Sequence, residues 1–275
     1  MKYFIIILSI LILTISVFLI TKNFIWQKHK SIESTGKNVF IKQNLNTKPL
    51  ILNKQEINNI NINSSINTPK IIFDNDFSEI KRGDTTKKQV IFTFDAGSSN
   101  NSIREILESL NKYGLKATFF LTGKWAERYP DDVKNISRAG HEIFNHTYSH
   151  PRLTQISDQQ IIEELRKTEQ IIFDLTGKTT KPFFRPPYGE RSSHVLALAK
   201  DEGYQSVFWT VDVLDWQESS GMTEEKAKER IYNNLANGNI FLMHVGDNIT
   251  GKILDEVINK IQTEGYKILP LSLGI

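Results

Sequence analysis

The sequence predicts an α/β domain folded as a distorted, incomplete (β/α) barrel of about seven parallel strands, preceded by an N-terminal transmembrane helix and a flexible stem. Three observations lead to this prediction. After Lys88, short β-branched or aromatic runs alternate with amphipathic segments, which is typical of parallel βα units. Residues 3–20 contain no charged residue, and residues 22–68 are polar without a sustained hydrophobic period. The chain therefore divides into an anchor, a spacer and one large folded domain.

The composition of the 275 residues, 39% hydrophobic and 24% charged, excludes a collagen-like, a coiled-coil and a fully disordered protein. No cysteine is present, which excludes disulfide scaffolds, thiolate zinc sites and cysteine nucleophiles. Residues 1–88 carry 13 Lys and Arg against 6 Asp and Glu, a balance of +7, whereas the rest carry 21 against 25, a balance of −4. Because the basic excess lies outside the domain core, we expect no nucleic-acid binding.

Residues 1–21 are predicted to form a transmembrane signal-anchor. With a helical rise of ~1.5 Å per residue, the apolar stretch 3–20 nearly spans a hydrocarbon core of about 30 Å. No small-residue cleavage site follows Ile20, which favours a retained anchor over a cleaved signal peptide. The lysines after this stretch outnumber Lys2, which by the positive-inside rule favours a cytoplasmic domain. An N-terminal anchor before a large domain usually acts as an export signal, however, so we expect a single-pass protein of the cell membrane with an extracytoplasmic domain.

Residues 22–68 are expected to form a flexible polar stem, because they bury too little apolar surface to offset the loss of chain entropy. Residues 69–275 are assigned to the folded domain, with its core at 88–272. A tethered domain on such a stem suits an immobile polymer near the membrane better than a diffusible sugar.

The predicted elements of the domain follow one another in a regular order. Strands are expected at residues 89–94, 116–121, 141–145, 183–185, 206–212, 239–244 and 267–271. Helices are expected at residues 101–113, 158–175, 191–202, 223–236 and 249–263. Stop signals follow these helices at Gly114, Gly177, Gly203, Gly238 and Gly265.

The core is shorter than a standard eightfold barrel, at about 185 residues, which predicts an incomplete one. A doubly wound open sheet is the alternative. No Gly-rich phosphate loop follows the first predicted strand, so no nucleotide is expected to bind.

Ionisable residues recur where the predicted strands end. They are Asp95, His146, His150, Arg185, Asp212, Asp215 and His244. The carboxyl ends of parallel barrel strands meet on one face, where active sites are built. The pattern therefore predicts one site assembled from five strands.

His146 and His150, four residues apart on a turn before Pro151, point the same way and are candidates to share a metal ion. Two histidines on a helix face or in the core are the ordinary alternative. His141 lacks this spacing and is expected to be structural.

Each of the other candidates has a chemical and an ordinary interpretation. Asp95 would emerge from an apolar strand as a general base, or it caps the next helix. Arg185 needs a carboxylate partner if buried, and otherwise forms a surface salt bridge. His244 would pair with Asp215, which would raise its pKa and make it a proton donor, or it is a satisfied core histidine. Trp216 would form a wall of a sugar-binding groove, or it packs in the core.

Together these residues resemble the polysaccharide deacetylases of carbohydrate esterase family 4, which contain the NodB homology domain. The likeness extends over residues 88–272 and includes five motifs in order. The motifs are Thr93-Phe-Asp-Ala96, His146-Thr-Tyr-Ser-His150, Arg185-Pro-Pro-Tyr188, Asp212-Val-Leu-Asp-Trp216 and Leu242-Met-His244.

The resemblance implies a role for each matching residue. Asp95 would be the catalytic base, held by Arg185, and His244 the acid, paired with Asp215. His146 and His150 would bind a divalent metal, zinc by expectation, with cobalt, nickel or manganese as alternatives. The backbone amide of Tyr188 would help stabilise the oxyanion, and Trp216 and Leu242 would line the acetyl pocket.

The first motif departs from the family pattern at Ala96, where the family has a second acid that serves as the third metal ligand. Weaker metal affinity is the direct expectation, because catalytic zinc normally has three protein ligands. Asp247, Asn100 and Asn101 are candidate replacement donors.

The expected function is metal-dependent hydrolysis of N-acetyl groups on an amino-sugar polysaccharide, with peptidoglycan as the expected substrate and a monomer as the expected state. Two alternatives stay open from the sequence. One is a catalytically weakened barrel that binds glycan without cleaving it, and the other is an esterase that acts on O-acetyl groups.

Overall fold

The structure is a computed structural model that describes residues 79–275. The predicted anchor (residues 1–21) and stem (residues 22–68) lie outside this range. Within residues 79–275, no helix is long and apolar enough to cross a membrane.

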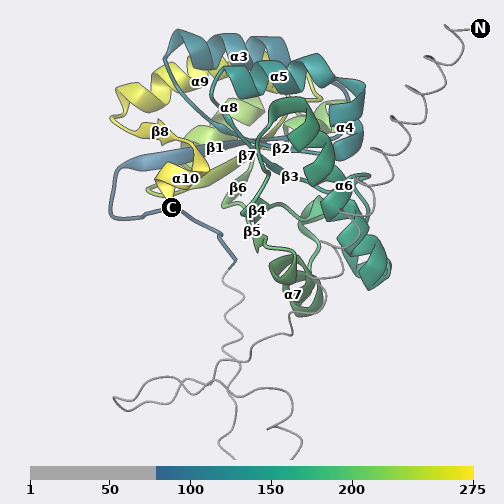
Figure 1. The fold of residues 1–275 in the computed structure, drawn as a ribbon. Coiled ribbons are helices and arrows are strands. Elements are labelled where there is room, and N and C mark those ends of the chain that lie inside the picture. The colour runs from purple at the N-terminus through teal and green to yellow at the C-terminus, as the bar shows by residue number, and fades with distance from the viewer. Residues whose placement is uncertain (1–78) are drawn as a thin grey trace, which may run out of the picture. The chain divides into compact units, whose positions relative to one another are not determined.

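A sheet of parallel strands forms the centre of the domain (Figure 1). The strands are β1 (Gln89–Ala96), β2 (Thr118–Leu121), β3 (Glu142–Asn145), β4 (Phe183–Phe184), β5 (Gln205–Ser206), β6 (Val211–Asp212), β7 (Ile240–His244) and β8 (Lys267–Leu269). Their order in space is β5-β4-β3-β2-β1-β7-β6, and β8 also pairs with β1. The described strands all pair in parallel, as the βα rhythm predicts.

Helices surround this sheet (Figure 1). They are α3 (Ile103–Lys112), α4 (Gly123–Arg128), α5 (Pro130–Arg138), α6 (Asp158–Thr176), α7 (Ser193–Asp201), α8 (Glu224–Asn233), α9 (Ile249–Thr263) and α10 (Leu271–Gly274), with short 3₁₀ turns η1 (Leu153–Gln155), η2 (Pro187–Gly189) and η3 (Asp215–Ser220). The five predicted helices are confirmed to within a few residues at each end. Helix α6 begins at a capping box formed by Ser157 and Gln160 and ends at Gly177, whose φ of 71° completes a left-handed C-cap.

Three helices were not expected from the sequence. Helices α4 and α5 occupy the segment between β2 and β3, where Pro130 at the first position of α5 separates two short helical stretches. Helix α10 replaces the end of the last predicted strand, because Pro270 ends the pairing of β8 with β1.

The fifth predicted strand, residues 206–212, is wrong as a single element, because the structure divides it into β5 and β6. Strand β5 pairs with β4 at one edge of the sheet, and β6 pairs with β7 at the other. Between them, the amide of Val207 donates to the carbonyl of Phe184 and that of Thr210 donates to Ile240, each at 2.9 Å. One segment therefore runs from one edge of the sheet to the other, although β5 and β6 do not pair with each other in the described sheet. This arrangement fits the predicted distorted, incomplete barrel rather than a doubly wound open sheet.

The alternation of side chains along β1 determines what faces the barrel interior. Phe92, Phe94 and Ala96 pack in the large apolar cluster with the helices. Ile91 packs in the interior cluster, and Asp95 lies beside His244 of β7 in the strand register. The same alternation therefore places Asp95 in the barrel interior and Ala96 under the helices.

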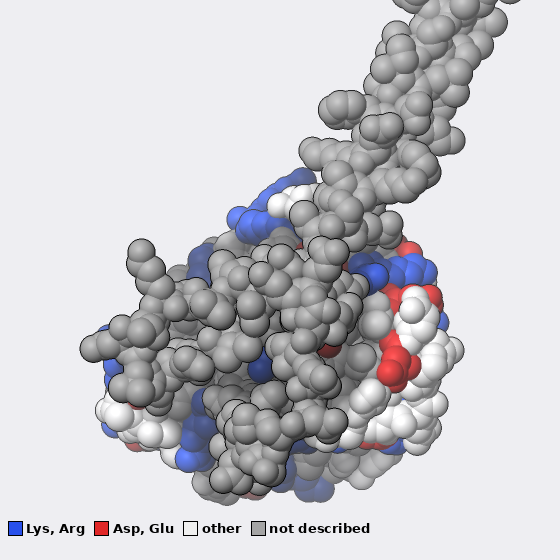
Figure 2. All heavy atoms as spheres, turned by 60° about the horizontal axis from the view of Figure 1, so that its bottom comes forward, with Lys and Arg blue, Asp and Glu red and all other residues white. Residues whose placement is uncertain are grey.

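Charged side chains are visible at the edges of one face of the domain (Figure 2). Figure 2 shows Lys and Arg side chains at separate places around one face, some of them beside Asp or Glu. Arg166 and Glu202, which form two hydrogen bonds of 2.7 and 2.8 Å, are one such exposed pair.

Candidate active site

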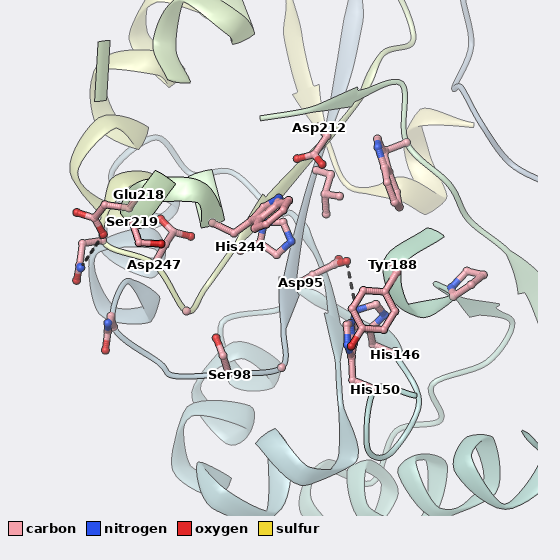
Figure 3. Close-up of a pocket in the computed structure, with 18 residues that line it drawn as sticks. Asp95, Ser98, His146, His150, Tyr188, Asp212, Glu218, Ser219, His244 and Asp247 are labelled. Carbon is pink, nitrogen blue, oxygen red and sulfur yellow. Dashed lines mark hydrogen bonds and ion pairs between the residues drawn. The ribbon is translucent and has the colours of Figure 1, made fainter. Parts of the chain in front are cut away.

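A pocket of about 750 Å³ opens at the carboxyl ends of the strands. Residues from five strand ends line it, as Figure 3 shows for Asp95, His146, His150, Asp212 and His244. The structure thus brings together the residues that the sequence placed at strand ends. Arg185 and Asp215 lie behind this lining, each fully buried.

Asp95 is held from behind by Arg185. Oδ1 of Asp95 accepts a hydrogen bond of 2.6 Å from Nη1 of Arg185, whose side chain has no exposed surface. The guanidinium also donates to Oγ1 of Thr93 at 3.0 Å and to the carbonyls of Val207 and Phe208, each at 3.3 Å. Because one carboxylate oxygen is fixed, Oδ2 is left for the pocket, where it faces Nε2 of His146 at 3.4 Å.

His146 and His150 lie side by side in the loop that follows β3, with 4.8 Å between ring centroids. Nδ1 of His146 is 2.8 Å from the carbonyl oxygen of Arg185, which places the proton on Nδ1 and leaves Nε2 as a lone-pair donor. Burial lowers the pKa of His146, and burial together with the neighbouring His146 lowers that of His150 to about 3. Both rings are therefore neutral near pH 7, which is the form that binds metal.

His244 and Asp215 form a hydrogen-bonded pair at another side of the pocket. Nδ1 of His244 is 2.8 Å from Oδ1 of Asp215, and the backbone N–H of His244 donates to Oδ2 at 2.7 Å. Thr250 adds a hydroxyl hydrogen bond to Oδ2. Burial opposes the charged imidazole, but Asp215, with Asp95 and Asp212 nearby, outweighs it and raises the pKa of His244 to about 9. The imidazole is therefore protonated near pH 7.

Two more carboxyl groups lie on this side of the pocket. Burial raises the pKa of Asp212, whose Oδ1 accepts a hydrogen bond of 2.8 Å from the amide of Leu214. Burial and the charge of Asp215 raise the pKa of Asp247 to about 7. Figure 3 shows Asp247 on the His244 side.

Aromatic side chains form the rim. Tyr188 is 58% exposed and packs on His150 with 4.5 Å between ring centroids, while Trp216 is 53% exposed. Leu242 lines the pocket from β7, two residues before His244. Trp209, which the sequence did not single out, also lines it. No local sequence pattern identifies Trp209 as a pocket residue. It lies in the segment between β5 and β6, whose course depends on contacts with Phe184 and Ile240.

The residues of the pocket match a divalent metal ion only in part. Two neutral imidazoles suit such an ion, but no group of three or more His, Cys, Asp or Glu side chains within residues 79–275 is arranged to hold one. Ala96 is fully buried in the apolar cluster. The site thus supplies two of the three donors that a catalytic zinc normally has.

Of the candidate replacement donors, Asp247 does not complete this set. Oδ1 of Asp247 accepts hydrogen bonds from the backbone amides of Ile249 and Thr250. Asp247 and the two imidazoles lie on opposite sides of Asp95 (Figure 3). Asn100 donates to Asp132 at 2.7 Å. Asn101 lines the pocket and stays a candidate donor.

Comparisons with known proteins agree with this geometry. Residues 82–207 match the family model described as polysaccharide deacetylase. The chain is 36% identical over 193 residues to a peptidoglycan-N-acetylglucosamine deacetylase of Bacillus cereus, which covers 69% of each chain. It is 34% identical over 184 residues to the peptidoglycan-N-acetylmuramic acid deacetylase PdaA of Bacillus subtilis, which covers 67% of this chain and 70% of PdaA.

The chain belongs to the polysaccharide deacetylase family. Polysaccharide deacetylases are hydrolases of carbon–nitrogen bonds, and the resemblance found in the sequence motifs is therefore confirmed. Among solved structures, a carbohydrate esterase family 4 pseudoenzyme from Bacillus anthracis is similar, with a TM-score of 0.67 and 33% identity over 71% of this chain and 68% of that chain. A mutant of that pseudoenzyme, described as having restored enzymatic activity, is also similar. Its TM-score is 0.67, with 34% identity over 71% of this chain and 70% of that chain.

Proposed function

We propose that this protein hydrolyses N-acetyl groups on the amino sugars of peptidoglycan. The observation that carries the proposal is the arrangement of two opposed proton-transfer groups in one pocket. The carboxylate of Asp95 and the protonated imidazole of His244 lie side by side across β1 and β7, and each is fixed from behind, by Arg185 and by Asp215. The peptidoglycan deacetylases among its relatives support the choice of substrate.

The arrangement suits acetyl-amide hydrolysis. Oδ2 of Asp95 takes a proton from water while the water oxygen attacks the acetyl carbonyl carbon. His244 gives its proton to the amide nitrogen as the carbon–nitrogen bond breaks, which releases acetate and a free amine. The aromatic rings of Tyr188 and Trp216 flank the pocket, where they suit the apolar face of a sugar ring.

We also propose that His146 and His150 hold a divalent cation, zinc by first choice, with lower affinity than a three-ligand site. A bound cation would supply polarisation of the acetyl carbonyl. The neutral state of both rings and the free Nε2 of His146 support this proposal.

The proposed location follows from the sequence. We place residues 1–21 in the cell membrane as a retained anchor and the domain on the outer side, where peptidoglycan lies. The long apolar stretch 3–20 supports the anchor.

Release of acetate from N-acetylated peptidoglycan by the full chain tests the proposed activity. Asp95→Asn keeps the shape of the side chain and removes the base, so we expect acetate release to fall by about 10²-fold or more. Circular dichroism of the variant should match the wild type. If Asp95→Asn releases acetate at the wild-type rate, the proposed reaction is wrong.

A second function, glycan binding without cleavage, is favoured by one observation. The resemblance of the first motif predicts that Ala96 replaces a metal-binding acid. The similar Bacillus anthracis protein is described as a pseudoenzyme. Glycan binding without acetate release, in the presence of added zinc or cobalt, would support this alternative and contradict the enzymatic proposal.

A further inference from the structure

Asp247 has an unusual place beside the proposed acid. It lies in the loop between β7 and α9, three residues after His244, and is 9% exposed. Oδ1 accepts hydrogen bonds of 2.8 and 3.0 Å from the backbone amides of Ile249 and Thr250, so this oxygen caps α9. Oδ2 is buried and accepts no hydrogen bond from a donor within the described part of the chain. The carboxyl group instead lies within side-chain hydrogen-bond reach of Asp215, so one oxygen caps the helix and the group as a whole faces the partner of His244.

Thr250 connects Asp247 to the His244 pair. Its backbone N–H donates to Asp247, and its hydroxyl donates to Oδ2 of Asp215. Asp215 in turn holds both Nδ1 and the backbone N–H of His244. The carbonyl of Asp247 also accepts a hydrogen bond from Ser102 of the loop before α3, which fixes the main chain at this position. Asp247 is therefore joined to the imidazole through two fixed partners.

Charges of one sign surround the imidazole. Asp215 and Glu218 lie on η3, Asp95 on β1, Asp212 on β6 and Asp247 before α9. No ion pair joins Asp247 to a Lys or Arg in residues 79–275, whereas Asp95 has the guanidinium of Arg185. Within the described residues, the imidazolium of His244 is therefore the cation that a negative charge on Asp247 would stabilise.

We propose that Asp247 is a positioning residue for the acid: its carboxyl group holds Thr250 against Asp215, and its ionised form keeps the proton on His244. This inference rests on the proposed role of His244 as the acid. The pKa of Asp247, raised to about 7 by burial and by Asp215, makes its charge change within the working range of the site.

The test is the titration of the His244 imidazole, followed by NMR in the full chain with labelled histidine and assigned with His244→Gln. The wild-type midpoint is expected near 9. Asp247→Asn retains the cap but cannot ionise, so the midpoint should fall by about half a unit or more. Asp247→Ala should lower it similarly and also lower the thermal midpoint of unfolding, which separates charge from capping.

Ser192→Ala is the matched control, because Ser192 caps α7 by accepting the amide of Val195 and lies on another helix. It should lower stability without moving the His244 titration. The alkaline limb of acetate release should move with the imidazole midpoint. An unchanged midpoint in Asp247→Asn would overturn the inference. A lowered midpoint in a protein that releases no acetate would support the inference and contradict the proposed function, so the two failures are distinguishable.

Discussion

The guanidinium of Arg185 and the carboxylate of Asp95 form a buried ion pair, with 2.6 Å between Nη1 and Oδ1. The two residues are 90 positions apart in the chain. Asp95 lies on β1 and Arg185 directly follows β4, and these two strands are not neighbours in the sheet. The pair therefore depends on the tertiary fold and not on local structure. It fixes the orientation of the proposed base and links it to the carbonyls of the segment between β5 and β6.

Arg185→Ala should strongly destabilise the fold. The substitution leaves the buried carboxylate of Asp95 without its partner, which typically costs about 3–5 kcal/mol in the free energy of unfolding. Urea unfolding measures the loss. Arg166→Ala, which removes an exposed Arg from its pair with Glu202, is the control and should cost less than about 1 kcal/mol. Equal losses in the two variants would show that the buried pair has no special role.

Stability should depend on pH through His244. Its folded-state pKa of about 9 lies above the ordinary 6.5, so the pair with Asp215 stabilises the fold fully below pH 6.5, and this stabilisation is lost as the pH rises through 9. His244→Gln should therefore lower the free energy of unfolding on the order of 2 kcal/mol at about pH 6 and have little effect at about pH 10.

The control for this pH series is His194→Gln. His194 pairs with Asp158 at 2.8 Å on the surface, where both side chains are more than half exposed. Solvent screens such a pair, so we expect no comparable change between the two pH values. If the difference in the free energy of unfolding between the wild type and His244→Gln stays constant with pH, the positive charge assigned to His244 is wrong.

Ala96→Asp should raise the affinity for zinc by about tenfold or more, if the added carboxylate joins the two imidazoles as a third donor. Ala96 is the last residue of β1 and directly follows Asp95, whose Oδ2 faces Nε2 of His146, so the variant tests whether a carboxylate at this position reaches the imidazoles. Zinc affinity by competition with a chelating dye is the measurement. Without metal the variant should be less stable, because a buried carboxylate is unpaired.

Ala126→Asp is the control for that variant, since Ala126 is equally buried in the same apolar cluster. It should lose stability, and zinc should not restore it. If zinc binds Ala96→Asp no better than the wild type, the placement of the missing ligand is wrong.

Trp216→Ala should weaken glycan binding several-fold with little change in stability, because its ring lines the pocket and is 53% exposed. Isothermal titration with chitin or peptidoglycan fragments measures the affinity. Phe173, 49% exposed on α6 and outside the pocket lining, is the matched control. An equal loss of affinity in Phe173→Ala and Trp216→Ala would contradict the assignment of Trp216 to the glycan-binding surface.

Much of the fold could be predicted from periodicity, because strands and helices of a βα array alternate and glycines mark the helix ends. Helices α4 and α5 were missed because they are short and joined at Pro130, so neither shows enough turns for a clear period. The division of residues 206–212 was also missed. It depends on contacts with Phe184 and Ile240, which no local pattern of residues reveals.

The candidate site could be predicted as a set of residues but not as a geometry. Polar residues at strand ends identified Asp95, His146 and His244, because parallel strands bring their carboxyl ends together. The sequence offered Asp247 as a metal donor, whereas its Oδ1 caps α9 and its neighbours are Asp215 and Thr250. That difference depends on which way a loop turns after β7, which side-chain chemistry alone does not determine.

The segment between β5 and β6 helps to orient the proposed base, Asp95, through Arg185. Its carbonyls at Val207 and Phe208 accept hydrogen bonds from the same guanidinium that orients Asp95. Separation of this segment from Arg185 would leave the guanidinium held by Asp95 and Thr93 alone. The orientation of the proposed base therefore depends in part on backbone carbonyls that are far from it in the sequence.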